Sequence, residues 1–264
     1  MNLLDYFRSA IHQLKLINNI LADKENNTLI TAHRGASGEA PENTIASITK
    51  ALDYKSDIIE IDVQETKDGE VVLHHDFTLK RTAKIQKLIA NLTLNELGEL
   101  EVGSWFDSKF KGEKIPTLNQ VIELINGKAL LNIELKSGIH QQQLAEKVES
   151  IITDLKLFDD CFVTSFDFSL IEKVKSRSSQ IKTGYIFSMF SNINPHIIEK
   201  VDIVSVNHRF LSKKLIRYAR ERKKEIHVWT VNKEKEMTRL IGMGVDSIIT
   251  NFPDIAIKLR DNYD

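Results

Sequence analysis

The chain has 264 residues, a formal net charge of −1 and a hydrophobic fraction of 42%. This length suits a single large α/β domain, and the balanced charge excludes the basic surface by which proteins attract nucleic acid. The single cysteine, Cys161, excludes an internal disulfide, and no cluster of cysteines and histidines supports a zinc site.

Residues 1–28 precede the first predicted strand and form an amphipathic extension. Their apolar side chains recur near helical spacing, at Leu4, Phe7, Ile11, Leu14, Ile17 and Leu21. Charged residues interrupt this stretch, so it has neither a signal-peptide core nor a membrane span, and we expect a cytoplasmic protein. The pattern predicts a helix that packs against the bottom or side of the domain formed by residues 29–264. A helix on a membrane surface, or the end of a segment joined to a membrane domain, is the alternative, but two lysines before residue 25 give it little attraction to anionic lipid.

Short β-branched runs alternate with longer helical patterns along the rest of the chain, as in repeated βα units. The runs predict eight strands, at residues 29–33, 58–62, 129–134, 161–165, 182–186, 202–206, 226–231 and 247–250. The helical patterns are found at residues 42–54, 118–125, 141–155, 168–176, 195–200, 212–222, 233–243 and 254–259. Pro41 is expected to open the first of these helices, and Asp167 and Asn232 to cap the fourth and the seventh. Eight such units predict a closed (β/α)8 barrel.

One further apolar run, residues 70–75, does not fit this count. Only the seven residues 63–69 separate it from the strand that ends at Asp62, and they include the turn signal Lys67-Asp68-Gly69. A parallel crossover needs about a dozen residues or more, so we expect an antiparallel hairpin instead. The hairpin would bring His75 back to the carboxylates of the preceding strand. It would begin an insertion of about residues 63–116, with a short helix at 94–100, on the catalytic side of the barrel.

Three carboxylates are expected to meet at the mouth of this barrel. Glu60 and Asp62 lie two residues apart in an apolar strand, so both point to the same face. Glu134 and Lys136 have the same spacing at the end of the next barrel strand. Carboxylates buried together are costly without a cation between them, and hard oxygen ligands suit Mg²⁺ or Ca²⁺. Lys136 could then neutralise phosphate charge beside the metal; a buried ion-pair network without metal is the alternative.

Two histidines are candidates for acid–base chemistry at the same place. His33 and Arg34 end the first predicted strand, and His75 ends the hairpin. Imidazole exchanges protons near neutral pH, and the planar guanidinium of Arg34 suits two phosphate oxygens. His74 alternates to the other face and is expected to be structural. The other histidines are expected in core, rim or surface positions: His12, His140, His196, His208 and His227.

Two further residues allow two interpretations each. Glu42 lies near the start of the first predicted helix, where the helix dipole favours a carboxylate, and it could also orient His33 or Arg34. Trp229 ends the seventh barrel strand, either as an apolar wall against a substrate's carbon skeleton or as a core residue of the barrel.

Taken in order, several segments make the chain similar to the glycerophosphodiester phosphodiesterase family. The match runs from about Leu29 to Ala256. The segments are His33-Arg34-Gly35, Pro41-Glu42-Asn43-Thr44, Glu60-Ile61-Asp62-Val63, Thr66-Lys67-Asp68-Gly69, His75-Asp76, Leu79-Lys80-Arg81-Thr82, Glu134-Leu135-Lys136, Trp229-Thr230-Val231-Asn232 and Thr250-Asn251-Phe252-Pro253.

This resemblance implies a TIM barrel of the phospholipase-C-like type with an insertion after the second strand. It also implies metal-dependent hydrolysis of a small-molecule glycerophosphodiester to sn-glycerol 3-phosphate and an alcohol. The implied site consists of one Mg²⁺ or Ca²⁺ on Glu60, Asp62 and Glu134, acid–base roles for His33 and His75, and phosphate contacts from Arg34 and Lys136.

Two alternatives to this function stay open at the level of sequence. An enzyme like lysophospholipase D or sphingomyelinase D would need an apolar groove for a lipid chain, which Trp105, Phe106 and Phe110 could supply. A non-catalytic phosphate-binding barrel would also be compatible with the fold. A missing carboxylate or histidine would favour the second alternative, but every one is present.

Overall fold

The computed structural model describes residues 28–138, 141, 143–187 and 194–263. Within these ranges one sheet contains nine strands: β1 (Leu29–His33), β2 (Ile58–Glu65), β3 (Val71–Leu73), β4 (Leu130–Leu135), β5 (Cys161–Ser165), β6 (Lys182–Phe187), β7 (Ile203–Asn207), β8 (Glu225–Trp229) and β9 (Ser247–Thr250). The α-helices of the same ranges are α2 (Ile45–Asp53), α3 (Leu94–Gly98), α4 (Leu118–Ile125), α5 (Leu144–Leu155), α6 (Phe168–Arg177), α7 (Pro195–Lys200), α8 (Lys213–Glu221), α9 (Glu234–Gly242) and α10 (Pro253–Asp261). Two short 3₁₀ helices, Ile89–Asn91 and Ser108–Phe110, lie in the insertion.

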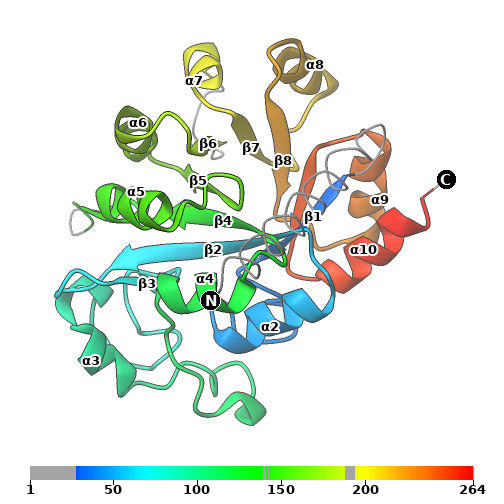
Figure 1. The fold of residues 1–264 in the computed structure, drawn as a ribbon. Helices are drawn as coiled ribbons and strands as arrows, with labels where there is room; N and C mark the ends of the chain where they lie inside the picture. Colours follow the sequence, from blue (N-terminus) through cyan, green and yellow to red (C-terminus); the bar gives the residue numbers. More distant parts are fainter. Residues whose placement is uncertain (1–27, 139–140, 142, 188–193, 264) are drawn as a thin grey trace, which may run out of the picture.

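Eight of these strands form the predicted closed barrel. They follow the order β1-β9-β8-β7-β6-β5-β4-β2, all neighbours are parallel, and pairing of β1 with β2 closes the ring. Figure 1 shows the helices arranged around the outside of the strands. The register sets His33 beside Glu60 and Asp62 beside Glu134. Residues far apart in the sequence therefore meet at the carboxyl-terminal end of the strands, where barrel enzymes carry their sites.

The predicted hairpin is confirmed, and it lies outside the barrel count. Strand β3 pairs antiparallel with β2, with Val63 opposite Leu73 and Glu65 opposite Val71. The insertion that follows has an apolar cluster of its own, built on Leu79, Ile89 and Leu97. Figure 1 places it, with α3, beside the barrel wall next to β3. It is therefore a small packed unit rather than a bare loop.

The first helix begins later than the sequence predicts. Pro41 was expected to open it, but α2 begins at Ile45, and Thr44 caps it in a reciprocal box with Ser47. Asn43 has φ 57°, in the left-handed region, so residues 41–43 cannot continue a right-handed helix. The short segment before the helix is instead a turn that leads from the mouth of the barrel.

The two other predicted caps have different outcomes. The carboxylate of Asp167 accepts from the backbone N–H of Ser169 and caps α6, as predicted. Asn232 does not cap α9, whose N-cap is Lys233. The side-chain oxygen of Asn232 accepts instead from the backbone N–H of Asn251 at 3.0 Å. Asn232 therefore forms a hydrogen bond to the residue that follows β9 instead of the expected bond at the helix N-terminus.

The amphipathic extension predicted for residues 1–28 lies outside the described residues, apart from Thr28. In the ranges that the structure describes, no helix combines the length and the apolar character needed to cross a bilayer.

Candidate active site

The three predicted carboxylates lie together at the carboxyl-terminal end of β2 and β4. One ligand atom from each of Glu60, Asp62 and Glu134 lies within 4.8 Å of the others. Ligands on opposite sides of one Mg²⁺ or Ca²⁺ lie up to about 5 Å apart, so the cluster fits a single ion. The side chains of Glu60 and Asp62 are buried, and Oε1 of Glu60 has no hydrogen-bond partner in the described part of the chain. A buried, unpartnered carboxylate oxygen is costly, and a cation would satisfy it.

The electrostatics of this cluster also favour a cation. Burial, followed by the charges of Asp62 and Glu134, raises the pKa of Glu60 well above its usual range. Burial raises the pKa of Glu134 to about 7. Burial alone would also raise the pKa of Asp62, but Lys136 and Arg34 outweigh it and hold this pKa well below the usual range. Burial and mutual repulsion therefore disfavour the charged forms of Glu60 and Glu134, and a cation between the carboxylates would favour these charged forms.

Two basic side chains border the carboxylates. Nε of Arg34 lies 3.0 Å from Oδ2 of Asp62, and its backbone N–H donates to Oε2 of Glu60 at 2.8 Å. Arg34 has φ 57°, a conformation that is uncommon for a residue with a side chain and that turns this N–H toward Glu60. Nζ of Lys136 contacts Glu134 at 2.8 Å and Asp62 at 3.3 Å. A guanidinium and an ammonium group beside a metal site are suited to hold a phosphate.

The surroundings of His33 favour its neutral form. Its Nδ1 lies 2.7 Å from the side-chain oxygen of Asn251, which can only accept, so Nδ1 carries the hydrogen and Nε2 keeps a lone pair. Burial, with the neighbouring charge of Arg34, lowers the pKa of His33 to about 4. Asn251 is positioned in turn by Asn232. From the sequence Asn232 is expected only to cap a helix, and no role is predicted for Asn251, although both lie in the segments that carry the resemblance.

The structure places His75, rather than His74, at the cavity that His33 lines. His75 and His33 line the same cavity, and Nδ1 of His75 lies 2.8 Å from Oδ1 of Asp76. His74 is buried, with its two ring nitrogens bonded to the backbone oxygen of Asp76 at 2.7 Å and to Oγ1 of Thr82 at 2.9 Å. These contacts make His74 part of the internal structure of the insertion.

Glu42 contacts two arginines at the edge of the site. Its carboxylate accepts from Nη1 of Arg34 at 3.0 Å and from Nη2 of Arg81 at 2.7 Å. Because α2 begins only at Ile45, the expectation of a first-turn carboxylate is wrong. The other interpretation, a partner that orients Arg34, matches this geometry. Burial of Glu42 is outweighed by the bond from Arg81 and by the charge of Arg34, which lower its pKa.

Several of these groups line a cavity of about 140 Å³ that has both charged and apolar residues in its lining. The charged and titratable residues are His33, Arg34, Glu60, His75 and Glu134. The apolar residues include Phe166, Ile186, Trp229 and Ile249, and the rings of Phe166 and Trp229 meet edge to face at 5.6 Å. Trp229 therefore lines the cavity together with Phe166, which no sequence pattern indicated. A small cavity with this lining suits a phosphate that bears a small carbon skeleton.

The aromatic residues proposed for a lipid groove are engaged with one another. Phe106 meets Trp105 and Phe110 edge to face, at 5.8 Å between centroids in both pairs. The Trp105 ring also lies 5.0 Å from the guanidinium carbon of Arg81. This arrangement does not favour the alternative of a lipid-chain groove at these three residues.

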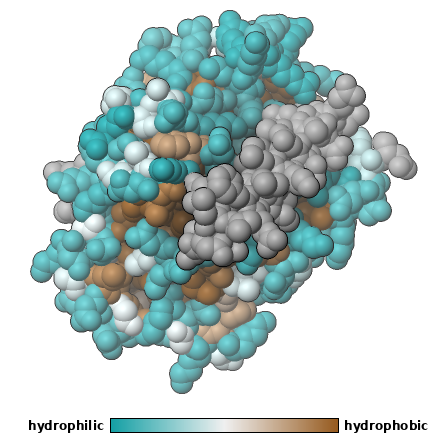
Figure 2. Space-filling view, viewed as in Figure 1, coloured by the Kyte–Doolittle hydropathy of each residue, from teal (hydrophilic) through white to brown (hydrophobic). Residues whose placement is uncertain are grey.

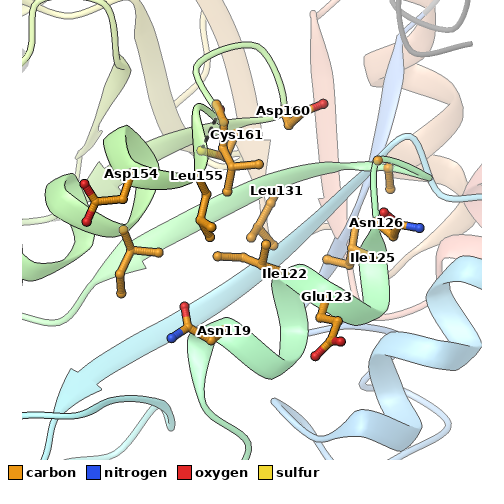
Figure 3. A pocket seen from close by; sticks show the side chains of 14 residues that line it. Asn119, Ile122, Glu123, Ile125, Asn126, Leu131, Asp154, Leu155, Asp160 and Cys161 are labelled. Atoms are coloured by element: carbon orange, nitrogen blue, oxygen red, sulfur yellow. Dashed lines mark hydrogen bonds between the residues drawn. The ribbon is translucent and has the colours of Figure 1, made fainter. Parts of the chain in front are cut away.

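A wider cavity, of about 520 Å³, lies outside the barrel between α4 and α5 (Figure 3). Figure 2 shows hydrophobic residues gathered over this part of the surface. Its lining includes Ile122, Leu131, Leu155 and Cys161, at the opposite end of the strands from the carboxylate cluster. Burial raises the pKa of Cys161 to about 12, so its thiol is not a nucleophile near neutral pH. The cavity at the carboxyl-terminal end is therefore the candidate active site.

Comparison with known proteins gives one consistent result. Residues 33–255 match the model of the glycerophosphoryl diester phosphodiesterase family. A glycerophosphodiester phosphodiesterase of Caldanaerobacter subterraneus subsp. tengcongensis is 36% identical over 237 residues, which cover 88% of this chain and 97% of that protein. A glycerophosphodiester phosphodiesterase of Bacillus subtilis is 30% identical over 255 residues, covering 89% and 87% of the two chains. An Oleispira antarctica phosphodiesterase, solved with its product sn-glycerol-3-phosphate, superposes with a TM-score of 0.81 at 28% identity, covering 89% of this chain and 98% of that one.

Proposed function

The chain belongs to the glycerophosphoryl diester phosphodiesterase family, and we propose that it hydrolyses glycerophosphodiesters to sn-glycerol 3-phosphate and an alcohol with the help of one divalent cation. The observation that carries this proposal is a cluster of three carboxylates, two of which, Glu60 and Glu134, line one small cavity together with two histidines. The product bound to the Oleispira antarctica relative has the size and charge that this cavity suits.

In this proposal Glu60, Asp62 and Glu134 hold Mg²⁺ or Ca²⁺. The bound cation would supply a Lewis acid beside the phosphate and would lower the cost of keeping three carboxylates charged. Arg34 and Lys136, which both contact the carboxylate cluster, would hold the phosphate oxygens. Trp229 would contact the carbon skeleton.

We assign the acid and base roles from the environments of the two histidines. With a pKa of about 4, His33 is neutral near pH 7. Its free Nε2 can accept a proton from the attacking group, which is either a water molecule or a hydroxyl of the substrate's glycerol. Nδ1 of His75 lies 2.8 Å from Oδ1 of Asp76, which orients the ring, and the other ring nitrogen would donate a proton to the leaving alcohol oxygen. The P–O bond to the alcohol breaks as the new P–O bond forms, and one water molecule is consumed overall.

The proposal is tested by release of sn-glycerol 3-phosphate from glycerophosphocholine and glycerophosphoethanolamine, and by release of choline from a lysophosphatidylcholine, whose other product would be lysophosphatidic acid. We expect release from the two deacylated substrates, and none in variants that replace His33 or His75 with alanine at the enzyme concentrations that suffice for wild type. Turnover of the lyso-phospholipid alone would favour the lysophospholipase alternative. Binding of glycerol phosphate without turnover of any substrate would favour a phosphate-binding protein.

A further inference from the structure

Arg81, in the insertion, connects two parts of the candidate site that approach from different directions. Its Nε donates to Oδ2 of Asp76 at 2.8 Å, and its Nη1 and Nη2 donate to the two oxygens of Glu42 at 3.0 and 2.7 Å. The guanidinium therefore bridges two carboxylates that belong to separate segments of the chain. A rigid planar fork is needed for such a bridge, and a lysine could not form it.

Besides binding Arg81, each of these two carboxylates also contacts one residue of the candidate site. Oδ1 of Asp76 lies 2.8 Å from Nδ1 of His75. Oε1 of Glu42 accepts from Nη1 of Arg34 at 3.0 Å, and Nε of Arg34 lies 3.0 Å from Asp62. One chain of contacts thus runs from His75 through Asp76, Arg81 and Glu42 to Arg34. Arg81 itself is not among the residues that line the cavity.

The insertion fixes the place of this guanidinium. The ring of Trp105 lies against it at 5.0 Å, within the range of a cation–π contact. Nε1 of Trp105 donates to the backbone oxygen of Val102 at 2.8 Å, and Val102 belongs to the apolar cluster of the insertion. The packed insertion thus supports Trp105, Trp105 contacts Arg81, and Arg81 reaches the carboxylates at the barrel mouth.

We propose that Arg81 is a positioning residue that sets the general acid His75 and the phosphate ligand Arg34 relative to each other. This inference rests on the proposed function, because it gives both partners their roles in phosphodiester hydrolysis. The insertion would then position groups of the active site, in addition to packing against the barrel. Displacing a reacting group by about 1 Å can cost on the order of 100-fold in rate, so a residue outside the cavity can control turnover.

The test combines kinetics with a matched neighbour. Arg81→Ala and Arg81→Lys should each lower kcat on glycerophosphocholine by roughly 10- to 100-fold, because neither can bridge both carboxylates. Lys80→Ala removes the adjacent, exposed cation and should leave kcat and KM unchanged. Arg81→Lys keeps the charge and the aliphatic part of the side chain, so the same kinetic test can be made with this variant if Arg81→Ala does not fold. Guanidinium ion should restore part of the activity of Arg81→Ala and none of that of His75→Ala.

A double-mutant cycle separates the two arms of the bridge. Asp76→Asn should lower mainly kcat, and Glu42→Gln should raise mainly KM for the phosphodiester. If Arg81 acts through Asp76, Arg81→Ala combined with Asp76→Asn should have nearly the kcat of the poorer single variant. Full multiplication of the two effects, or an Arg81→Ala enzyme as active as Lys80→Ala, would overturn the inference.

A measurement without substrate keeps this inference separable from the proposed function. In nitrogen-15 spectra of protein labelled at histidine, the two ring nitrogens of His75 should give one set of sharp signals in wild type and in Lys80→Ala. In Arg81→Ala the same signals should be broadened by exchange, because the ring no longer has one orientation. An unchanged His75 signal in Arg81→Ala would overturn the positioning role, whether or not the wild type is active. An inactive wild type whose His75 signal does change in Arg81→Ala would contradict only the proposed reaction.

Discussion

At the carboxyl-terminal end of the barrel the strands lead into buried charged groups, whereas an apolar layer fills the interior near their amino-terminal end. Glu60, Asp62 and Glu134 crowd the first end. At the second end Ile58, Phe162 and Ile203 are buried together, with Leu29 and Leu130 packed against them. Burying like charges opposes folding, and burying apolar area drives it. The charged groups that suit the carboxyl-terminal end for a reaction therefore destabilise the fold, and the apolar layer at the amino-terminal end stabilises it.

The largest effect is expected at the charged end, from Glu134→Gln. This change should abolish binding of Mg²⁺ or Ca²⁺ and lower turnover about 10³-fold, because a cation contributes several kcal/mol to the transition state. The melting temperature without added metal should not fall, because one of the crowded buried carboxylates has been removed. Calorimetric metal titration and thermal melting measure the two effects. Glu123→Gln, at the cavity between α4 and α5, is the matched control, and loss of metal binding in it would contradict the assignment.

Phe162→Ala should have the opposite profile at the apolar end. Truncation of a fully buried phenylalanine typically costs about 3–5 kcal/mol of unfolding free energy. The kcat per folded molecule should stay near that of wild type, since Phe162 does not line the active-site cavity. Urea unfolding combined with kinetics at low temperature measures both. A drop in kcat without loss of stability would show that the two ends are not separable.

Replacing either of the two proposed catalytic histidines should lower turnover with little effect on folding. His33→Ala and His75→Ala should each lower kcat by about 100-fold or more, the usual contribution of a general acid or base, and each should remove one limb of the pH–rate profile. His74→Ala should lower kcat far less and should instead cost roughly 1–3 kcal/mol of stability, since it leaves buried partners unsatisfied. Equal losses of kcat in His74→Ala and His75→Ala would mean that the assignment of the hairpin histidines is wrong.

The smallest expected effect is a dependence of stability on pH that originates at His33. Its pKa is about 4 in the folded protein and about 6.5 when unfolded, so between these values only the unfolded chain takes up the proton. Stability should therefore fall as the pH falls from about 6.5 to about 4, by on the order of 3 kcal/mol from this group. The His33→Asn variant should lose less stability across that window in urea titrations. An identical pH dependence in both proteins would contradict the buried, neutral state of His33.

Sequence reasoning succeeded where local patterns decide the structure. β-Branched runs located the barrel strands, and β1, β5 and β9 have the predicted bounds. The short connection before residue 70 predicted the hairpin because chain length alone forbids a parallel crossover. The spacing of Glu60 and Asp62 placed both on one face, and the barrel register then brought Glu134 to them.

Other features depend on partners that are distant in sequence, and no local pattern contains them. Asn251 positions His33 across 218 residues, and Arg81 reaches Glu42 across 39. The turn at Asn43 adopts a left-handed conformation, and its side-chain amide donates to Asp62 at 2.8 Å. A propensity for helix at residues 42–44 gave way to that tertiary contact. A polar residue in a turn is expected to form a hydrogen bond, but its partner is known only once the fold is known.

Metal-dependent turnover at the charged end is the central claim, and one experiment tests it most directly. Release of sn-glycerol 3-phosphate from glycerophosphocholine is measured with protein treated with excess EDTA, before and after Mg²⁺ or Ca²⁺ is restored. We predict no release in EDTA and recovery with one of the two cations, in wild type and in Glu123→Gln but not in Glu134→Gln. Undiminished release in excess EDTA would contradict the claim that the three buried carboxylates serve the reaction by binding a cation.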